Sequence, residues 1–172
     1  MYLANVAKAL TPVALAVLLS IGMTGCANQV PNPTANLTGD ANDPNGPVTP
    51  GSSRDFTVNV GNIVYFTTDS TDLTPDAQNT LRAQAGWLGK YPQYTITLEG
   101  HADERGTREY NLALGAKRSE TVRTFLASQG VNTARVRTIS FGKERPVAVC
   151  NDISCWSQNR RVVTVLNQRA GT

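Results

Sequence analysis

The stretch that decides the fold reads EGHADERGTREYNLALGAKRSE and covers residues 99–120. It begins at the end of a β-rich segment, passes through a polar turn, and continues as a long helix. The turn carries the carboxylate of Asp103. Asn111, Leu114 and Arg118 follow at spacings of three and four, so they share one helix face. We therefore expect the carboxylate and the guanidinium to face one small pocket, which would suit a ligand with both an ammonium and a carboxylate.

Length and charge exclude some classes of protein. The chain has 172 residues, enough for one compact domain with sequence left over. Its formal net charge is +3, and positive and negative residues alternate without forming runs. Nucleic-acid-binding proteins usually carry a basic stripe or an aromatic-rich basic motif. We therefore expect no nucleic-acid partner.

The first 25 residues have the pattern of a secretory signal peptide. Lys8 precedes an apolar run that is short and is interrupted by Pro12, which argues against a membrane-spanning helix. The run ends in Met-Thr-Gly before Cys26, and this sequence resembles a bacterial lipobox. The resemblance implies cleavage before Cys26 and attachment of acyl chains, palmitate among them, to that cysteine. An ordinary signal peptide with a chance cysteine is the alternative.

Residues 26–54 are predicted to be a lipidated N-terminus followed by a disordered linker. The segment is rich in Pro, Asn, Gly and Thr and has few large apolar residues. Such a composition cannot bury enough surface to offset the entropy of ordering. As a coil it would span about 30 Å, and fully extended roughly 95 Å. Ala27 follows the cysteine, and by resemblance to enterobacterial sorting this favours the outer membrane.

Residues 55–172 are predicted to form the folded domain. We expect a strand at 63–66, with 56–60 a further short strand, then strands at 94–99, 136–141 and 162–166. Helices are expected at 75–90, opened by Thr74, and at 107–128, with a loop or short helix at 150–159. The long helix should bury Leu112, Ala116, Val122, Phe125 and Leu126. The order β-α-β-α-β-β predicts an α/β fold of the two-layer α+β kind, with helices on one face of a mixed sheet.

Two late cysteines, Cys150 and Cys155, are separated by four residues. A secreted chain meets an oxidising compartment, which favours a small disulfide loop. A metal site is the alternative, but it would need two further ligands, and His101 is the only histidine. We expect a disulfide and no metal.

Four segments resemble one known family. They read VYFTTDSTDLTPDAQNTL, EGHADERGTREYNLALGAKRSETVRTFL, VRTISFGKERPV and WSQNRRV. They are similar to the OmpA-like domain that outer-membrane protein A shares with the peptidoglycan-associated lipoproteins. The resemblance covers residues 56–167, and the lipobox and linker extend it toward the lipoprotein branch. It implies noncovalent binding of peptidoglycan through the diaminopimelate of the peptide stem.

The resemblance also implies roles for single residues. In that family the aspartate that matches Asp103 holds the ligand ammonium, and the arginine that matches Arg118 holds the ligand carboxylate. Arg160 is expected as a second ligand contact. The family's usual residues are replaced at Thr67 and Ala102, which puts side-chain contacts there in doubt. The predicted peptidoglycan-binding set is Asp69, Asp103, Asn111, Leu114, Arg118 and Arg160.

The resulting expectation is a lipid-anchored binding protein on the periplasmic face of the outer membrane. It would tether that membrane to the cell wall within the Tol–Pal system, with TolB and other Tol–Pal components as partners, and support envelope integrity and cell division. No cofactor and no enzymatic activity are expected. Two alternatives stay open: a cell-wall hydrolase that uses Asp103 and Glu104 as acid and base, and a non-lipidated wall-binding module.

Overall fold

A computed structural model describes residues 48–167 of the chain. The predicted signal peptide, Cys26 and most of the predicted linker lie outside the described residues. Among the helices that are described, none is long and apolar enough to cross a membrane. In chain order the elements are α1 (Ser53–Asp55), the π-helix η1 (Phe56–Val60), β1 (Ile63–Tyr65), α2 (Pro75–Lys90), β2 (Thr95–His101), α3 (Arg108–Ser128), the 3-10 helix η2 (Thr133–Arg135), β3 (Val136–Gly142), α4 (Ile153–Asn159) and β4 (Arg161–Asn167).

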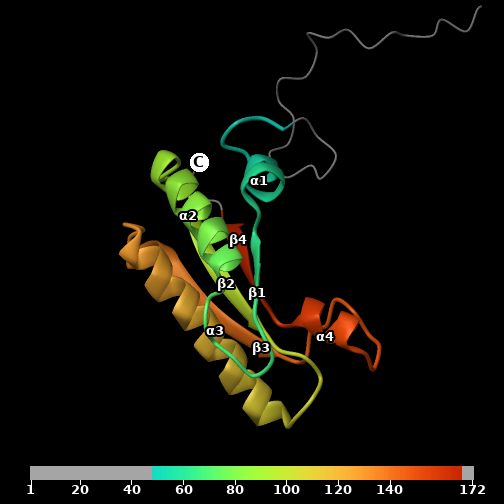
Figure 1. Cartoon of the computed structure of the whole chain (residues 1–172). Coiled ribbons are helices and arrows are strands. Elements are labelled where there is room, and N and C mark those ends of the chain that lie inside the picture. The colour runs from blue at the N-terminus through green and yellow to red at the C-terminus, as the bar shows by residue number, and fades with distance from the viewer. Residues whose placement is uncertain (1–47, 168–172) are drawn as a thin grey trace, which may run out of the picture. The chain divides into compact units, whose positions relative to one another are not determined.

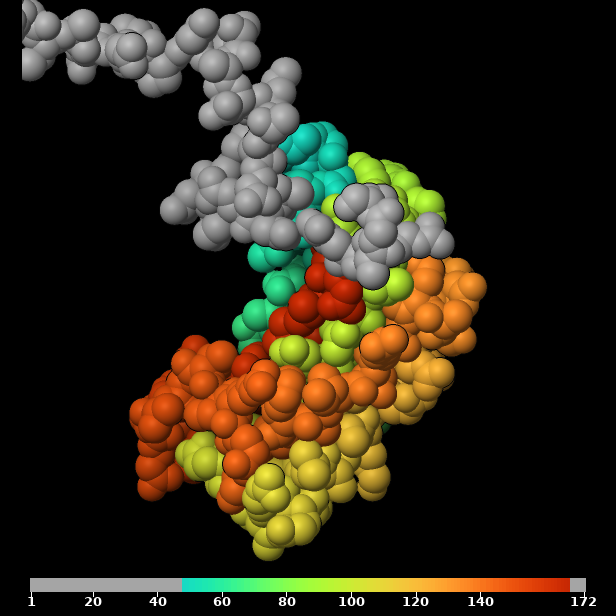
Figure 2. All heavy atoms as spheres, turned by 180° about the vertical axis from the view of Figure 1, so that it is seen from behind, coloured from blue at the N-terminus to red at the C-terminus, as the bar shows by residue number. Residues whose placement is uncertain are grey.

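The four strands form one mixed sheet in the order β1-β4-β2-β3. The pair β2/β3 is parallel, and β4 pairs antiparallel with both β1 and β2. Helices α2 and α3 cover one face of this sheet (Figure 1). The opposite face, seen in Figure 2, shows β3 and β4 in orange and red with no described helix in front of them. The predicted mixed sheet with helices on one face is confirmed.

The core lies between the two long helices and the sheet. Ile96 and Leu98 of β2 belong to the same buried apolar cluster as Leu81 of α2 and Val122 of α3. Alternate residues of a strand point to one face, so the Ile-Thr-Leu pattern buries its apolar members and leaves the threonine on the other side. Area removed from water in this cluster is the main source of the domain's stability.

Helix α2 begins and ends where its sequence predicts. The Thr74 hydroxyl accepts a hydrogen bond from the Ala77 N–H at 3.2 Å, and Pro75 occupies the first helical position. The helix ends at Lys90, ahead of Pro92, because the residue before a proline disfavours the helical conformation.

The segment 56–60 is helical, and the expectation of a short strand there is wrong. The Ser52 hydroxyl caps a helical turn by accepting from the Asp55 N–H at 3.1 Å, and the chain continues into η1. Phe56 is buried with its ring 4.9 Å from that of Trp87. A strand would point alternate residues of this segment toward the core, whereas only Phe56 is buried in η1.

The folded part also begins earlier than the predicted boundary at residue 54. The Asp55 carboxylate accepts from the Trp87 Nε1–H at 2.8 Å and from the Gly51 N–H at 2.9 Å. The Tyr94 hydroxyl donates to the Gly51 carbonyl at 2.8 Å. These contacts hold Gly51 and Asp55 against α2 and against Tyr94, the residue before β2, so part of the segment assigned to the linker by composition is ordered.

The first half of α3 buries different residues from those predicted. Val122 and Leu126 are buried as expected, but Leu112 and Ala116 are exposed. The reason is a close approach between Gly115 of α3 and Gly100 of β2. A Cβ on Gly100 would lie 1.9 Å from the Gly115 carbonyl oxygen, so the helix touches the strand with its backbone here. The residues that α3 buries are Asn111, Gly115, Arg118, Ser119, Val122 and Leu126.

Candidate functional site

A pocket of about 250 Å³ opens between three segments that are distant in sequence. These are the loop after β1, the turn after β2, and the first three turns of α3. The lining residues are Thr68, Asp69, Asp103, Arg105, Gly106, Tyr110, Asn111, Leu114 and Arg118. Five of the six residues predicted for the site therefore lie around one cavity, and Arg160 is the exception.

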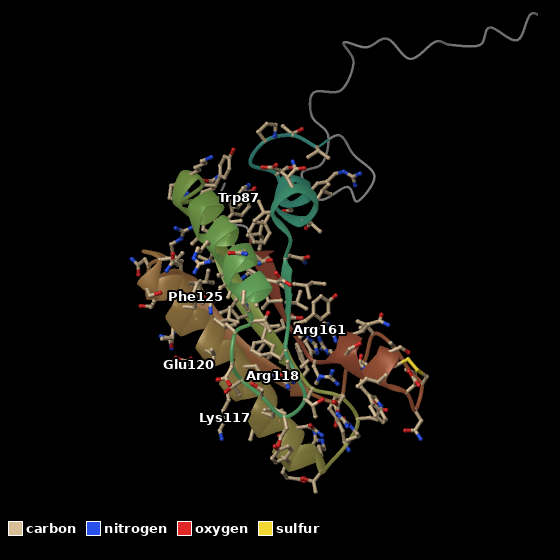
Figure 3. The ribbon with its side chains drawn as sticks, in the orientation of Figure 1. Trp87, Lys117, Arg118, Glu120, Phe125 and Arg161 are labelled. Atoms are coloured by element: carbon tan, nitrogen blue, oxygen red, sulfur yellow. A yellow bond between two sulfur atoms is a disulfide. The ribbon has the colours of Figure 1, made fainter. Side chains whose placement is uncertain are left out.

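Arg118 is the buried cation of this pocket. It projects from α3 toward the sheet (Figure 3) and is 0% exposed. Its guanidinium donates to three backbone carbonyls, those of Ser70 at 2.9 Å, His101 at 2.9 Å and Thr67 at 3.1 Å. A guanidinium has five N–H donors, so, counting bonds within residues 48–167, one N–H on each terminal nitrogen is left for a further acceptor.

The charge of Arg118 is not neutralised by a direct ion pair. Burial, with a smaller contribution from the nearby Arg160, lowers the pKa of Arg118 to about 10, so it stays protonated at neutral pH. Among residues 48–167 no carboxylate lies within ion-pair distance of it. A buried, charged guanidinium with two free donors is a suitable partner for a carboxylate from a ligand.

Asp103 lies at the start of the turn after β2 and contributes a carboxylate to the pocket. Its Oδ1 accepts from the Arg105 backbone N–H at 3.2 Å and from the Arg105 Nε–H at 3.1 Å. Its Oδ2 accepts from Arg105 Nη2 at 2.7 Å and from Arg160 Nη1 at 3.2 Å. Burial alone would raise the pKa of Asp103, but these hydrogen bonds outweigh it and hold the pKa below its usual value. Asp103 is therefore ionised at neutral pH.

Arg160 lies behind Asp103 and does not line the pocket. It is 6% exposed, and its Nε–H donates to the Phe66 carbonyl at 3.1 Å. The Phe66 N–H in turn donates to the Arg160 carbonyl at 2.9 Å. Arg160, the residue before β4, thus supports Asp103, and its expected role as a second ligand contact stays a prediction.

Asp69 lines the pocket from the loop after β1. Its φ of +52° is in the left-handed region, which aspartate tolerates better than most residues. The Tyr110 hydroxyl donates to Asp69 Oδ1. This hydrogen bond raises the pKa of Tyr110. The contact ties the loop after β1 to α3.

Asn111 fixes the turn that carries Asp103. Its Nδ2 donates to the Arg105 carbonyl at 2.6 Å and to the Thr107 carbonyl at 3.1 Å. Lys143 adds a second brace, since its Nζ donates to the Gly106 carbonyl at 2.7 Å. Asn111 therefore borders the pocket while its amide nitrogen is used to hold the backbone.

Sequence reasoning missed Arg105 and Tyr110 as members of the site. Arg105 pairs with Asp103, and its guanidinium carbon lies 4.2 Å from the ring centroid of Trp156. A signal for Tyr110 was present, because it lies four residues before Leu114 and so shares its helix face. The sequence carried no such signal for the stack on Trp156, which is contributed by α4.

A disulfide between Cys150 and Cys155, whose Cα atoms lie 5.7 Å apart, closes the loop directly before Trp156. Helix α4 begins inside this loop and contains Cys155, and the Asp152 side chain caps it by accepting from the Ser154 N–H at 2.8 Å. Trp156 Nε1 donates to a Glu104 carboxylate oxygen. No group of three or more His, Cys, Asp or Glu side chains that could hold a metal occurs among the described residues.

Comparison with known proteins gives consistent matches. The OmpA family model matches residues 65–160, a range that includes all six residues predicted for the site. A peptidoglycan-associated lipoprotein of Agrobacterium fabrum is 61% identical over 90% of this chain and 87% of its own length. One from Brucella melitensis is 59% identical over 91% and 92% respectively. The crystal structure of the peptidoglycan-associated lipoprotein from Burkholderia pseudomallei superposes with a TM-score of 0.62 at 42% identity, covering 73% of this chain and 98% of that one.

Proposed function

The chain belongs to the OmpA family and, within it, to the peptidoglycan-associated lipoproteins, and from this membership we propose that it binds peptidoglycan noncovalently and links the outer membrane to the cell wall. The proposal names diaminopimelate in the peptide stem as the group that is recognised. The end of this residue carries an ammonium and a carboxylate on one carbon.

One observation carries the proposal: a buried guanidinium with two free N–H donors shares a small pocket with two carboxylates. Arg118 would receive the ligand carboxylate in a bidentate contact. Asp69 and Asp103 are acceptors of the kind that an ammonium requires. Leu114 would pack against the carbon chain of the ligand. The cavity of about 250 Å³ fits the end of one amino acid rather than a long polymer.

The affinity for a single stem is expected to be modest. Charge-assisted hydrogen bonds contribute roughly 1.5–3 kcal/mol each, and binding must also overcome the loss of translational freedom. Peptidoglycan repeats the same stem many times, and anchored copies of the protein would bind it together. Avidity would then supply retention that one site does not.

The anchor is the second part of the proposal. We propose that residues 1–25 are a signal peptide, that Cys26 is lipidated, and that residues up to the folded domain act as a linker on the periplasmic face of the outer membrane. More than one acyl chain is needed for stable anchoring, and lipoprotein modification supplies several. Family membership further supports a place in the Tol–Pal system, with TolB as a partner and a role in envelope integrity and cell division.

A binding role is favoured over hydrolysis by the state of Asp103. A hydrolase would need one carboxylic acid that donates a proton and a second that acts as base. The pKa of Asp103 is held below its usual value by two arginines, so Asp103 is a poor proton donor at neutral pH. Glu104, the other carboxylate of the turn, accepts from Trp156. We therefore propose that the protein is not an enzyme.

Co-sedimentation with purified peptidoglycan tests the proposal. The full-length protein should sediment with it, and Asp103→Asn should lose most of this binding because the ammonium partner loses its charge. Asp76→Asn, which changes an exposed carboxylate in the first turn of α2, is the matched control and should bind like the wild type. Thermal unfolding must show that Asp103→Asn is folded. Undiminished binding by the folded variant would contradict the site, and mass spectrometry of the mature N-terminus tests the lipid at Cys26.

A further inference from the structure

The acceptor positions of the Asp103 carboxylate are all used by donors of the protein itself. A carboxylate offers about four lone-pair positions. Both oxygens of Asp103 accept two hydrogen bonds each, three from Arg105 and one from Arg160. An incoming ammonium can therefore bind Asp103 only if one of these donors leaves.

The two arginines differ in their freedom to leave. The Arg160 side chain is 7% exposed and is tied to the Phe66 carbonyl, so moving it would leave a buried charge without its partner. The Arg105 side chain is 41% exposed and lies in a turn. The Arg105 backbone N–H can keep its own bond to Asp103 while the side chain moves. Arg105 is thus the donor that a ligand would displace.

A displaced Arg105 guanidinium can remain stacked on the indole ring of Trp156. Its central carbon lies 4.2 Å from the ring centroid of Trp156, within the range of a cation–π contact. The indole is itself held by the Glu104 carboxylate and by its position directly after Cys155 of the disulfide. An arginine can keep its stack on an aromatic face while its hydrogen bonds to a carboxylate are broken.

We propose that Arg105 is an internal competitor for the ligand ammonium, with Trp156 as the platform that holds it in the bound state. The inference rests on the proposed function of the same site. A simple amine must displace Arg105 and gains only Asp103. The cost of displacing Arg105 is the same for both ligands and lowers both affinities. Only a ligand that also brings a carboxylate to Arg118 gains a second contact that offsets this cost.

Calorimetric titration of a soluble muropeptide that ends in diaminopimelate tests this inference on the full-length protein in detergent. Arg105→Met removes the competing charge but keeps much of the side-chain volume, and it should bind about 5–10-fold more tightly than the wild type. Arg108→Met is the matched control, because Arg108 is a neighbouring exposed arginine paired with Glu144 at 3.3 Å. It should change the dissociation constant by less than about twofold.

Two further arms separate competition from a structural effect. Arg105→Lys keeps a cation beside Asp103, so its affinity should return toward that of the wild type. A muropeptide whose diaminopimelate amine is acetylated has no ammonium to compete, so Arg105→Met should not bind it more tightly. If the wild type binds and Arg105→Met binds equally or more weakly, Arg105 is not a competitor and the inference is wrong. If neither the wild type nor any variant binds, the proposed function itself fails and the inference falls with it.

Discussion

Helix α3 buries two different kinds of surface along its length. Its C-terminal half buries Val122 and Leu126, which join the apolar cluster around Leu98. Its N-terminal half buries Asn111 and Arg118, whose nitrogen atoms donate to backbone carbonyls of the surrounding loops. The same helix therefore belongs to the hydrophobic core at one end and to the pocket at the other.

The difference shows how stability and binding are separated in this fold. The apolar half should tolerate substitutions that conserve side-chain volume, because apolar packing does not depend on directional hydrogen bonds. The pocket half is stable only while each buried donor and acceptor keeps its partner, because an unpaired buried polar group costs roughly 1–3 kcal/mol. A ligand can bind there because Arg118 keeps two donors free, and substitutions in the two halves should give separable effects.

The largest expected effect is that of Arg118→Ala. The substitution leaves the Thr67, Ser70 and His101 carbonyls without their donor, and it opens a cavity beside Phe66. We expect a loss of about 3–5 kcal/mol in the free energy of unfolding and no co-sedimentation with peptidoglycan. Urea denaturation and sedimentation measure the two quantities.

Lys117→Ala is the control for this substitution. Lys117 is the neighbour of Arg118 in α3 but lies on the exposed side of the helix. It should change stability by less than about 0.5 kcal/mol and leave sedimentation intact. Wild-type binding by a folded Arg118→Ala protein would remove Arg118 from the site.

Leu126→Ala is the corresponding change in the apolar half. Leu126 is 0% exposed, and truncating it should cost about 2–4 kcal/mol through lost burial and an unfilled cavity. Muropeptide affinity at a temperature where the variant is folded should stay within about twofold of the wild type. A tenfold loss of affinity would show that the two halves of α3 are coupled.

Acidification should destabilise the pocket end through His101. Burial, together with the nearby Arg161 and Arg145, lowers the pKa of His101 to about 4. Neither ring nitrogen has a hydrogen-bond partner among the described residues. The unfolded chain takes up the proton near pH 6.5, whereas the folded one resists it until about pH 4. Stability is therefore full above pH 6.5 and falls as the pH drops toward 4, by about 2–3 kcal/mol.

Urea denaturation at several pH values measures this loss. In His101→Leu the free energy of unfolding should depend much less on pH between 6.5 and about 4. Asp103 is separable from His101 because its pKa is lowered from 3.8, so its contribution is lost only at more acidic pH. The Glu99 carboxylate lies 3.9 Å from His101 Nε2, and it would reduce the loss of stability if it moved closer to a protonated ring. An unchanged pH profile in His101→Leu would assign the loss to other groups.

The parts of the fold that sequence predicts well are those set by local chemistry. The Thr74 cap, Pro75 and the stop before Pro92 define α2 through groups that lie within a few residues of each other. The alternation around Ile96 and Leu98 likewise identifies a strand and its buried face. Such patterns depend on backbone geometry, which the neighbouring residues determine.

The parts that sequence misjudges depend on partners far along the chain. The segment 56–60 has β-forming residues, yet it follows a turn that Asp55 anchors through Trp87, 32 residues away. Arg160 was expected in the pocket, but pairing of the chain at β1 and β4 ties it to Phe66, 94 residues away. The pocket's carboxylates and Arg118 were predictable from the long motif and its family resemblance. The supporting role of Arg160 can be recognised only when the order of the strands in the sheet is known.

The smallest effect is expected from loss of the disulfide, and it tests whether the segment around Trp156 supports the pocket. Replacing Cys150 and Cys155 by serine opens a loop whose ends are only five residues apart, so the free energy of unfolding should fall by only about 1–2 kcal/mol. Muropeptide affinity should still fall by about 2–3-fold, because Trp156 is the platform for Arg105 and is less firmly placed without the bridge.

Trp156→Ala in the disulfide-bonded protein should weaken binding to the same extent, and adding the serine substitutions to it should weaken binding no further, since both act through one contact. Additive losses would instead mean that the disulfide supports the pocket by another path, through the Asn159 side chain that holds the Val147 N–H at 2.9 Å.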